Sequence, residues 1–396
     1  MATVDYTDLG FRAFDADHHY YEAPDAFTRH IPAGWERRTM QWAEINGKRR
    51  LLVAGKVNRF IPNPLFDPVA RPGSLDEYFR GKSAGDDIRA AFGELEPIHP
   101  GYRSPAARVP QLDEQHIESA LLFPTLGVGM EEALVHDPDA AHVAFHAFNE
   151  WMHDDWTFDY QQRLYAAPYL TLVDPAQAEQ EMEWALAHGA KVVVMRPGPV
   201  RGPNFSRSPA DPVYDGFWAR AAEAGITVSY HSGDAGYNRY AADWGAGGEM
   251  QAFRYDPLMG LLTGHRPIHD TIGALVCGGV FTRHPRLRVA TIEAGSSWVA
   301  DLYGYFKKAY AQRPTAFEAD PSEQLREHVW ISPYYEDDLP LLRDLHGSDR
   351  MLFGSDYPHA EGLADPCSFV HDLPGFDDGE IHRIMRDNGM ALVQPA

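Results

Sequence analysis

The chain has 396 residues, of which 44% are hydrophobic and 23% are charged, and it can bury a large core. Its formal net charge of −22 argues against nucleic acid and anionic membranes as partners, because phosphate contacts need a basic face. We expect a cytoplasmic protein, since the sequence has no stretch of about 18 apolar residues and its first eight residues lack a signal-peptide pattern.

Short apolar strands alternate with helical stretches from one end of the chain to the other. The predicted strands cover residues 9–14, 119–124, 166–172, 191–195, 226–231, 287–293, 328–331 and 350–356. Strands alternating with helices are typical of an α/β fold with a parallel sheet, and eight of them predict a (β/α)8 TIM barrel. We expect residues 1–396 to form a single domain of this kind.

Two stretches interrupt the alternation, one after the first predicted strand and one after the fifth. Residues 24–112 are rich in Pro, Gly and Arg, and residues 232–269 carry several aromatic side chains, including Trp244. Both insertions follow the carboxyl ends of strands, where barrel enzymes build their pockets. We expect them to line a pocket, with Trp244 binding an apolar part of the substrate. For residues 24–112, an ordinary surface insertion is an equal alternative.

Polar residues gather at the end of the first predicted strand. Asp15, Asp17 and His19 share one face of an extended chain, because side chains alternate with a period of two, and Glu22 lies just beyond. Carboxylates beside an imidazole at the end of a buried strand are costly unless a cation pairs with them. A metal ion is the simplest such cation, with Asp17 and His19 as its expected ligands and Asp15 as a supporting residue.

Residues that bind metals also end three further predicted strands. His231 ends the fifth strand, Glu293 the sixth and Asp356 the eighth. Each of them alone is more often an ordinary core, loop or helix-capping residue. Because strand ends converge on one face of a barrel, their recurrence predicts a site for one or two divalent ions, Zn, Fe or Mn.

These motifs resemble those of the amidohydrolase superfamily, in its branch of amidohydrolase-related, decarboxylase-like proteins. The matching motifs are Asp15-Ala16-Asp17-His18-His19 with Glu22, His231-Ser232-Gly233, Arg283-His284-Pro285-Arg286-Leu287 leading to Glu293-Ala294-Gly295-Ser296-Ser297-Trp298, and Gly354-Ser355-Asp356-Tyr357-Pro358-His359. The resemblance spans about residues 10–390 and implies a TIM barrel with a metal at Asp17, His19, His231 and Asp356.

The chain departs from the superfamily pattern at three places. Asp17 stands where the first strand usually begins a His-x-His motif, and the fourth strand ends in Met195-Arg196-Pro197 without the carbamylated Lys of many dinuclear members. Glu293 stands where decarboxylase members have a His on the sixth strand. The candidate metal ligands are therefore Asp17, His19, Glu22, His231, Glu293 and Asp356, and the candidate catalytic residues are Asp356, Glu293 and His359.

The first functional hypothesis is metal-dependent hydrolysis or decarboxylation of a small, partly apolar carboxylate, amide or ester. A divalent ion lowers the pKa of its water to about 7, and Asp356 would take the proton as general base. Arg196 would hold a substrate carboxylate through two hydrogen bonds. A structural ion pair is an equally good explanation of Arg196.

Two other hypotheses belong to different classes of function. The wealth of carboxylates suits a non-heme di-iron monooxygenase that hydroxylates an apolar substrate, with Glu293 or Glu22 bridging two irons and a ferredoxin-type protein as electron donor. The third hypothesis is a non-catalytic binding protein, because a fold does not fix a function. The expected partners are a small-molecule substrate and a second copy of the chain in a homodimer.

Overall fold

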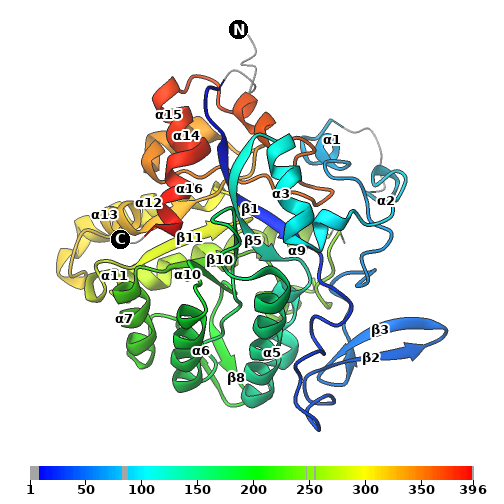
Figure 1. Ribbon diagram of the computed structural model, residues 1–396. Coiled ribbons are helices and arrows are strands. Elements are labelled where there is room, and N and C mark those ends of the chain that lie inside the picture. Colours follow the sequence, from blue (N-terminus) through cyan, green and yellow to red (C-terminus); the bar gives the residue numbers. More distant parts are fainter. Residues whose placement is uncertain (1–8, 83–87, 247, 254–255, 395–396) are drawn as a thin grey trace.

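The computed structural model describes residues 9–82, 88–246, 248–253 and 256–394, and it shows a mixed α/β fold (Figure 1). Its central strands form two parallel sheets, with strand orders β1-β5-β6 and β12-β11-β10-β7. The strands are β1 Ala13–Tyr20, β5 Ile117–Pro124, β6 Leu164–Ala166, β7 Val192–Met195, β10 Thr227–His231, β11 Arg288–Ile292 and β12 Val329–Ile331. The predicted α/β fold with parallel strands is confirmed. Within the described residues, no helix combines the length and apolar character needed to cross a bilayer.

Backbone hydrogen bonds connect the edges of the two sheets. After β6, the Leu170 amide donates to the Val194 carbonyl of β7 at 2.9 Å. At the other edge, the Leu352 amide donates to the Ile331 carbonyl of β12 at 2.8 Å, and the His19 amide of β1 donates to the Tyr357 carbonyl at 2.8 Å. Residues 351–357 therefore lie between β12 and β1, and they bring Asp356 beside the first strand.

Three predicted strands differ from the observed elements. The first strand extends through the polar segment to Tyr20, because those side chains find partners in the interior. The third is Leu164–Ala166 and not 166–172, since Pro168 lacks an amide donor. The predicted strand 350–356 forms only an isolated bridge at Met351, and Asp356 at φ 57° has left the extended conformation.

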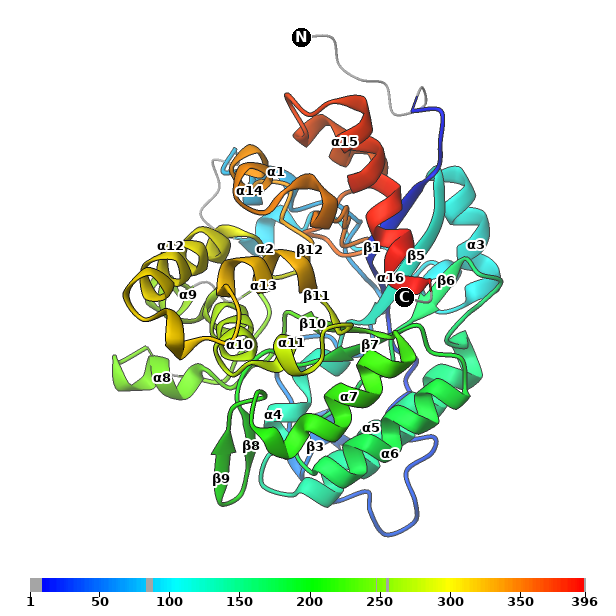
Figure 2. The ribbon, with the colours of Figure 1, turned by 90° about the vertical axis from the view of Figure 1, so that its left-hand side faces the viewer.

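Helices connect the strands and cover the sheets on the outside (Figure 2). The longer ones are α3 Pro105–Glu114, α5 Pro138–Trp156, α6 Pro175–Ala187, α7 Asp215–Ala224, α10 Arg266–Cys277, α12 Ser297–Gln312, α13 Pro321–His328 and α14 Leu339–His346. Several begin with an Asp followed by a Pro. In α6, the Asp174 side chain accepts from the Gln177 amide and Pro175 occupies the first helical position, where its missing N–H costs nothing.

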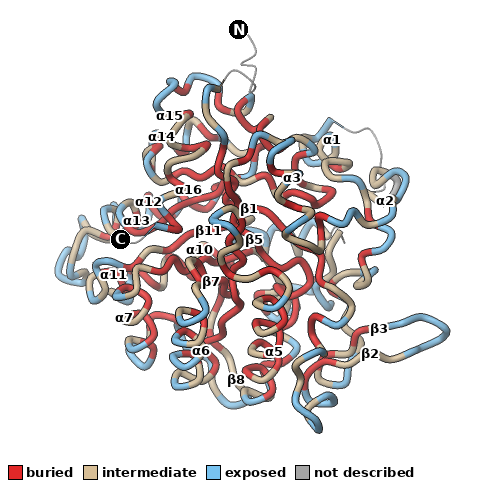
Figure 3. The backbone as a smooth tube through the Cα atoms, in the orientation of Figure 1, coloured by how far each residue is buried: buried red, intermediate tan, exposed pale blue. Residues whose placement is uncertain are grey.

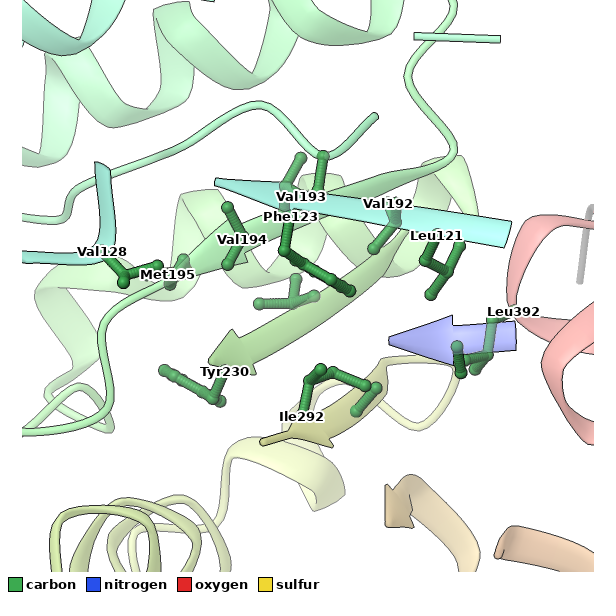
Figure 4. Packing of buried hydrophobic residues seen from close by; sticks show 14 of the residues in the cluster. Leu121, Phe123, Val128, Val192, Val193, Val194, Met195, Tyr230, Ile292 and Leu392 are labelled. Atoms are coloured by element: carbon green, nitrogen blue, oxygen red, sulfur yellow. The ribbon is translucent and has the colours of Figure 1, made fainter. Parts of the chain in front are cut away.

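The core lies along the strands, which are buried over most of their length (Figure 3). All four residues of β7, Val192–Met195, are buried, as a strand covered on both faces requires. In Figure 4 the side chains of Phe123 and Ile292 lie among those of β7 and β10. This packing holds the carboxyl ends of β1, β10 and β11 in fixed positions.

The two long stretches between strands contact each other. Residues 24–112 contain an antiparallel sheet of β2 Met40–Ile45, β3 Lys48–Val53 and β4 Lys56–Val57, followed by α1 Asp76–Phe79, α2 Ile88–Ala91 and most of α3. The β2–β3 hairpin projects from the body (Figure 1). Residues 232–269 contain α8 Asn238–Asp243 and α9 Pro257–Thr263. The Ala252 amide donates to the Phe60 carbonyl at 2.8 Å and joins the two stretches.

His346, at the end of α14, predicts a pH dependence of stability. Its Nε2 lies 2.8 Å from the Val329 carbonyl and its Nδ1 lies 2.8 Å from the Tyr303 hydroxyl. The carbonyl can only accept, so the neutral ring satisfies both partners, and burial lowers the pKa of His346 to about 4. Because the unfolded pKa is about 6.5, the folded state should lose about 2 kcal/mol through this group between pH 7 and pH 5. Denaturant unfolding at both pH values should show this loss reduced in His346→Gln, and equal losses in the two proteins would contradict it.

Candidate metal centre and active site

Five of the six predicted metal ligands come together, from four places in the fold. Asp17 and His19 lie within β1, His231 ends β10, Glu293 follows β11, and Asp356 lies in the segment after β12. Glu293 and Asp356 have positive φ angles of 48° and 57°, a conformation that is uncommon outside glycine and that clusters at functional sites. Their backbones thus turn both carboxylates back toward β1.

His19 is at the centre of this group. Its Nε2 lies 3.3 Å from Asp17 Oδ1, 3.4 Å from Glu293 Oε2 and 3.3 Å from Asp356 Oδ1. Three carboxylates around one buried imidazole nitrogen leave an excess of negative charge that needs a cation.

His231 presents a second imidazole nitrogen to the same point. Its Nε2 lies 3.3 Å from His19 Nε2 and 3.2 Å from Glu293 Oε2. Its Nδ1 lies 2.8 Å from the Ser232 carbonyl, to which it donates, so the Nε2 lone pair is directed at the cluster. Asp17 Oδ1 is buried without a hydrogen-bond partner among the described residues. A divalent ion would satisfy this oxygen and both nitrogens.

The donor atoms form two overlapping sets of four residues, within each of which they lie within 4.8 Å of one another. The first donor set is Asp17, His19, His231 and Glu293, and the second is His19, Glu293, Asp356 and His359. Ligands about 2.1 Å from a divalent ion stand roughly 3.0–3.4 Å apart in octahedral or tetrahedral geometry. The separations of 3.2–3.4 Å around His19 and from His231 to His19 and Glu293 match this spacing, and His231 Nε2 lies 3.7 Å from Asp17 Oδ1. The residues therefore fit a divalent metal.

The charges of the cluster perturb the pKa values of its members. Burial opposes a charge on His19, but the neighbouring carboxylates of Asp17 and Glu293 outweigh it and raise the pKa of His19 to about 9. Burial also opposes ionisation of Asp17, and the two imidazoles nevertheless lower its pKa to about 2. The pKa of Asp356 is raised well above its ordinary value, first by burial and then by the charge of Glu293. Metal binding would take the place of the proton on His19.

His359 connects Asp356 to a hydroxyl group. Its Nδ1 lies 2.6 Å from Asp356 Oδ1, and its Nε2 lies 2.9 Å from Thr125 Oγ1. Because Thr125 donates its single proton to the Tyr20 carbonyl at 2.8 Å, it accepts from His359 Nε2–H. Nδ1 is therefore the nitrogen that can share a proton with Asp356. Thr125 belongs to no distinctive sequence motif, and it was not predicted as a site residue.

Hydrogen bonds of Asp15 and Arg108 hold Asp17 and His19 in place. Asp15 Oδ1 accepts from the amides of Asp17 and Ser355, both at 3.0 Å, and Asp15 Oδ2 lies 3.0 Å from His18 Nε2. Buried Arg108 donates to the His19 carbonyl at 2.7 Å. His18 thus faces away from the cluster and Asp15 supports it, whereas Arg108, ninety residues along the chain, carried no signal in the sequence.

A cavity of about 880 Å³ opens above the cluster. Asp17, His19, His231, Glu293 and Asp356 form part of its lining, and residues from 60–95 and 250–253 form much of the remainder. Both long stretches between strands thus contribute to its walls. A concave, largely apolar site with a few converging polar groups is typical of enzymes.

Comparisons with known proteins identify the family. A family model described as amidohydrolase matches residues 14–393. The chain belongs to the amidohydrolase family. The resemblance drawn from the motifs is thereby confirmed, and family membership supports an enzyme over a non-catalytic binding protein.

Individual members of the family differ in their likeness to this chain. An amidohydrolase structure from Mycobacterium avium subsp. paratuberculosis K-10 is 46% identical, covers 97% of this chain and 99% of its own, and has a TM-score of 0.92. A manganese complex of 5-carboxyvanillate decarboxylase from Novosphingobium aromaticivorans DSM 12444 is 16% identical, with 98% and 97% covered and a TM-score of 0.58. A 2-amino-3-carboxymuconate-6-semialdehyde decarboxylase of Dictyostelium discoideum is 24% identical over 127 residues, which is 31% of this chain and 35% of that enzyme.

Glu22 lies outside both donor sets of this amidohydrolase-family site. Its Oε1 accepts from the amides of Leu126 and Gly127 at 2.8 and 2.9 Å, and burial raises its pKa to about 7 although those amides lower it. One carboxylate oxygen therefore holds the backbone after β5, and Glu22 as a metal ligand stays a prediction that neither donor set includes.

The position of Glu22 gives a direct test. Gln at this position can still accept both amide protons, so Glu22→Gln should leave the metal content per chain unchanged and the melting temperature within a few degrees of the wild-type value. Elemental analysis and a thermal scan measure both. Loss of one metal equivalent would return Glu22 to the ligand set.

The two predicted substrate-binding residues also lie elsewhere. Arg196 Nη1 donates to Glu132 Oε2 at 2.7 Å and its Nη2 donates to the Pro199 carbonyl at 3.1 Å, so the buried guanidinium is occupied by a structural ion pair. Trp244 follows α8 and is 62% exposed. Neither lines the large cavity. Arg196 was predicted from its position at a strand end, and Trp244 from its aromatic side chain. Neither feature shows whether a residue lines the cavity.

Proposed function

We propose that this amidohydrolase-family enzyme is a metal-dependent decarboxylase of an apolar carboxylic acid. The observation that carries the proposal is the cluster of Asp17, His19, His231 and Glu293 at the floor of a large, aromatic-walled cavity. Several related solved structures and the curated relative are named as decarboxylases, and three of those structures contain manganese. An apolar cavity also favours the loss of a charged carboxylate as neutral CO₂.

The proposal includes a (β/α)8 barrel as the scaffold. In the proposed barrel, seven parallel strands and the segment 351–357 would follow one another around the site. The bridges Tyr169–Val194, Ile331–Met351 and His18–Tyr357 between their edges support this arrangement. In such a barrel the active site lies at the carboxyl ends of the strands, where His231 and Glu293 stand.

The ligands and the proton donor have separate roles in the proposed reaction. A divalent ion held by the first donor set would supply the positive charge that binds the substrate carboxylate. When the bond between the carboxyl group and the substrate carbon breaks, its electron pair stays on that carbon and CO₂ leaves. The Asp356–His359 pair, hydrogen-bonded at 2.6 Å, would deliver the proton that replaces the carboxyl group. Thr125 fixes the ring of His359 for this transfer.

The test is a turnover assay on protein loaded separately with Mn²⁺ and Zn²⁺. Aromatic carboxylic acids should release CO₂ and leave the corresponding decarboxylated products, whereas their amides and esters should remain intact. Hydrolysis of the amides or esters without CO₂ release would contradict decarboxylation and show that the enzyme is a hydrolase. Asp356 would then act as general base.

A di-iron monooxygenase is the second candidate function, because the Glu293 carboxylate belongs to both donor sets. A Glu293 carboxylate between two ions, with Glu361 nearby in the lining of the same cavity, would suit a carboxylate-rich dinuclear centre. Such an enzyme needs an external electron donor of the ferredoxin type. Two irons per chain together with oxygen-dependent hydroxylation would favour this function over decarboxylation.

A further inference from the structure

The cavity above the donor cluster is much larger than the reacting group requires. Its volume of about 880 Å³ is near the upper end of the roughly 300–1,000 Å³ typical of small-molecule sites. The proposed chemistry uses only the floor, around His19 and Asp356. The walls carry aromatic side chains, among them Phe60, Phe66, Tyr78, Phe92, Phe253 and Tyr335.

Two segments that are remote in sequence form one continuous apolar wall. The rings of Phe92 and Phe253 meet edge to face, with centroids 4.9 Å apart and an angle of 86° between the planes. The hydrogen bond from the Ala252 amide to the Phe60 carbonyl fixes the same junction. The lining side chain of Leu95 is 53% exposed, and exposed apolar surface in a concave site marks ligand binding.

The walls offer no positive charge. Among the described lining residues none is Lys or Arg, whereas five carboxylates line the cavity: Asp17, Glu293, Glu336, Asp356 and Glu361. A phosphate, a sulfate or a second carboxylate on the substrate would lose its water at these walls without gaining a cationic partner. The cavity therefore selects against phosphorylated compounds and dicarboxylates.

We propose that the substrate carries, beyond its reacting carboxyl group, an extended uncharged skeleton of fused rings or comparable hydrocarbon. About twenty or more non-hydrogen atoms are needed to fill a cavity of this size class. The inference rests on the proposed function for the identity of the reacting group. A single benzene ring would leave much of the wall around Phe92 and Phe253 in contact with water, and most of the available hydrophobic stabilisation would be lost.

Binding of three aromatic anions to the metal-containing protein tests this inference. The probes are 1-pyrenecarboxylate, benzoate and pyrene-1,3,6,8-tetrasulfonate, followed by pyrene fluorescence anisotropy and by competition for benzoate. We expect 1-pyrenecarboxylate to bind about 100-fold more tightly than benzoate, as the larger buried apolar area predicts, and the tetrasulfonate not to compete. Equal affinity for benzoate, or tight binding of the tetrasulfonate, would overturn the inference.

Substitutions in the cavity wall test where 1-pyrenecarboxylate binds. Phe92→Ala should weaken 1-pyrenecarboxylate about 10-fold and leave benzoate unchanged. Tyr305→Ala is the matched control, because Tyr305 lies on α12, is 58% exposed and is not among the lining residues; it should change neither affinity. Should Phe92→Ala fail to fold, Leu95→Lys is the second variant, and the cation that it adds to the cavity should give the tetrasulfonate measurable affinity. An unchanged pyrene affinity in folded Phe92→Ala, or no gain in Leu95→Lys, would contradict the inference.

Failure of the inference and failure of the proposed function give different results. If 1-pyrenecarboxylate binds through Phe92 while no acid is decarboxylated, the proposed reaction is wrong and the inference about the cavity holds. If single-ring acids are decarboxylated with kcat/KM values as high as those of fused-ring acids, the reaction holds and the inference is wrong.

Discussion

Asp356→Asn is expected to lower kcat by about 1,000-fold, within the range that general acid–base catalysis contributes. The amide keeps the shape of the carboxylate but cannot share a proton with His359 Nδ1, which lies 2.6 Å from Asp356 Oδ1. The first donor set does not include Asp356, so the metal should remain bound. Steady-state kinetics and elemental analysis of the same preparation measure both quantities.

Glu336→Gln is the matched control for Asp356→Asn. Glu336 lines the same cavity but belongs to neither donor set, and its kcat should change less than about threefold, as for a substitution away from the reacting atoms. Comparable losses in the two variants would show that negative charge in the cavity matters in general and that Asp356 has no specific role in proton transfer.

His19→Gln should abolish both metal binding and turnover. His19 belongs to both donor sets, and its Nε2 lies within 3.4 Å of donor atoms on Asp17, Glu293 and Asp356. Without this ligand the three carboxylates repel one another, and metal affinity should fall at least 100-fold, more than the 10- to 100-fold typical of residues that only support ligands. Metal content after dialysis and titration calorimetry with Mn²⁺ measure the change.

His328→Gln separates the loss of a ligand from the loss of a buried imidazole. His328 is buried at the end of α13, and its Nδ1 lies 2.9 Å from the Leu287 carbonyl, away from both donor sets. It should bind metal as the wild-type protein does. A folded His19→Gln protein with wild-type metal content would contradict the assignment of His19.

The sequence predicted the elements that carry a strong apolar signal. The buried runs of β7 and β10 fall within one or two residues of their predicted positions. The prediction failed at residues 350–356, where the apolar residues predict a strand. The backbone turns at Asp356 instead and directs its carboxylate toward β1. Residues at functional positions often violate local rules in this way.

The site itself was predicted where strand ends converge and was missed where partners are remote in sequence. Asp17, His19, His231, Glu293 and Asp356 could be predicted because each lies at or just beyond the end of a strand predicted from the sequence. Arg108 and Thr125 act through contacts with backbone carbonyls and with His359, which no local pattern encodes. The two explanations of Arg196 stayed equal because the sequence does not show that Glu132 pairs with its guanidinium.

The most direct test of the account is to remove and restore the metal while following turnover. Protein stripped with a chelator should show no decarboxylation, and titration with Mn²⁺ should restore activity in proportion to occupancy, with saturation at one ion per chain and no response in His19→Gln. Full turnover by the metal-free protein, or restored activity in metal-loaded His19→Gln, would contradict the assignment of this cluster as the catalytic metal centre.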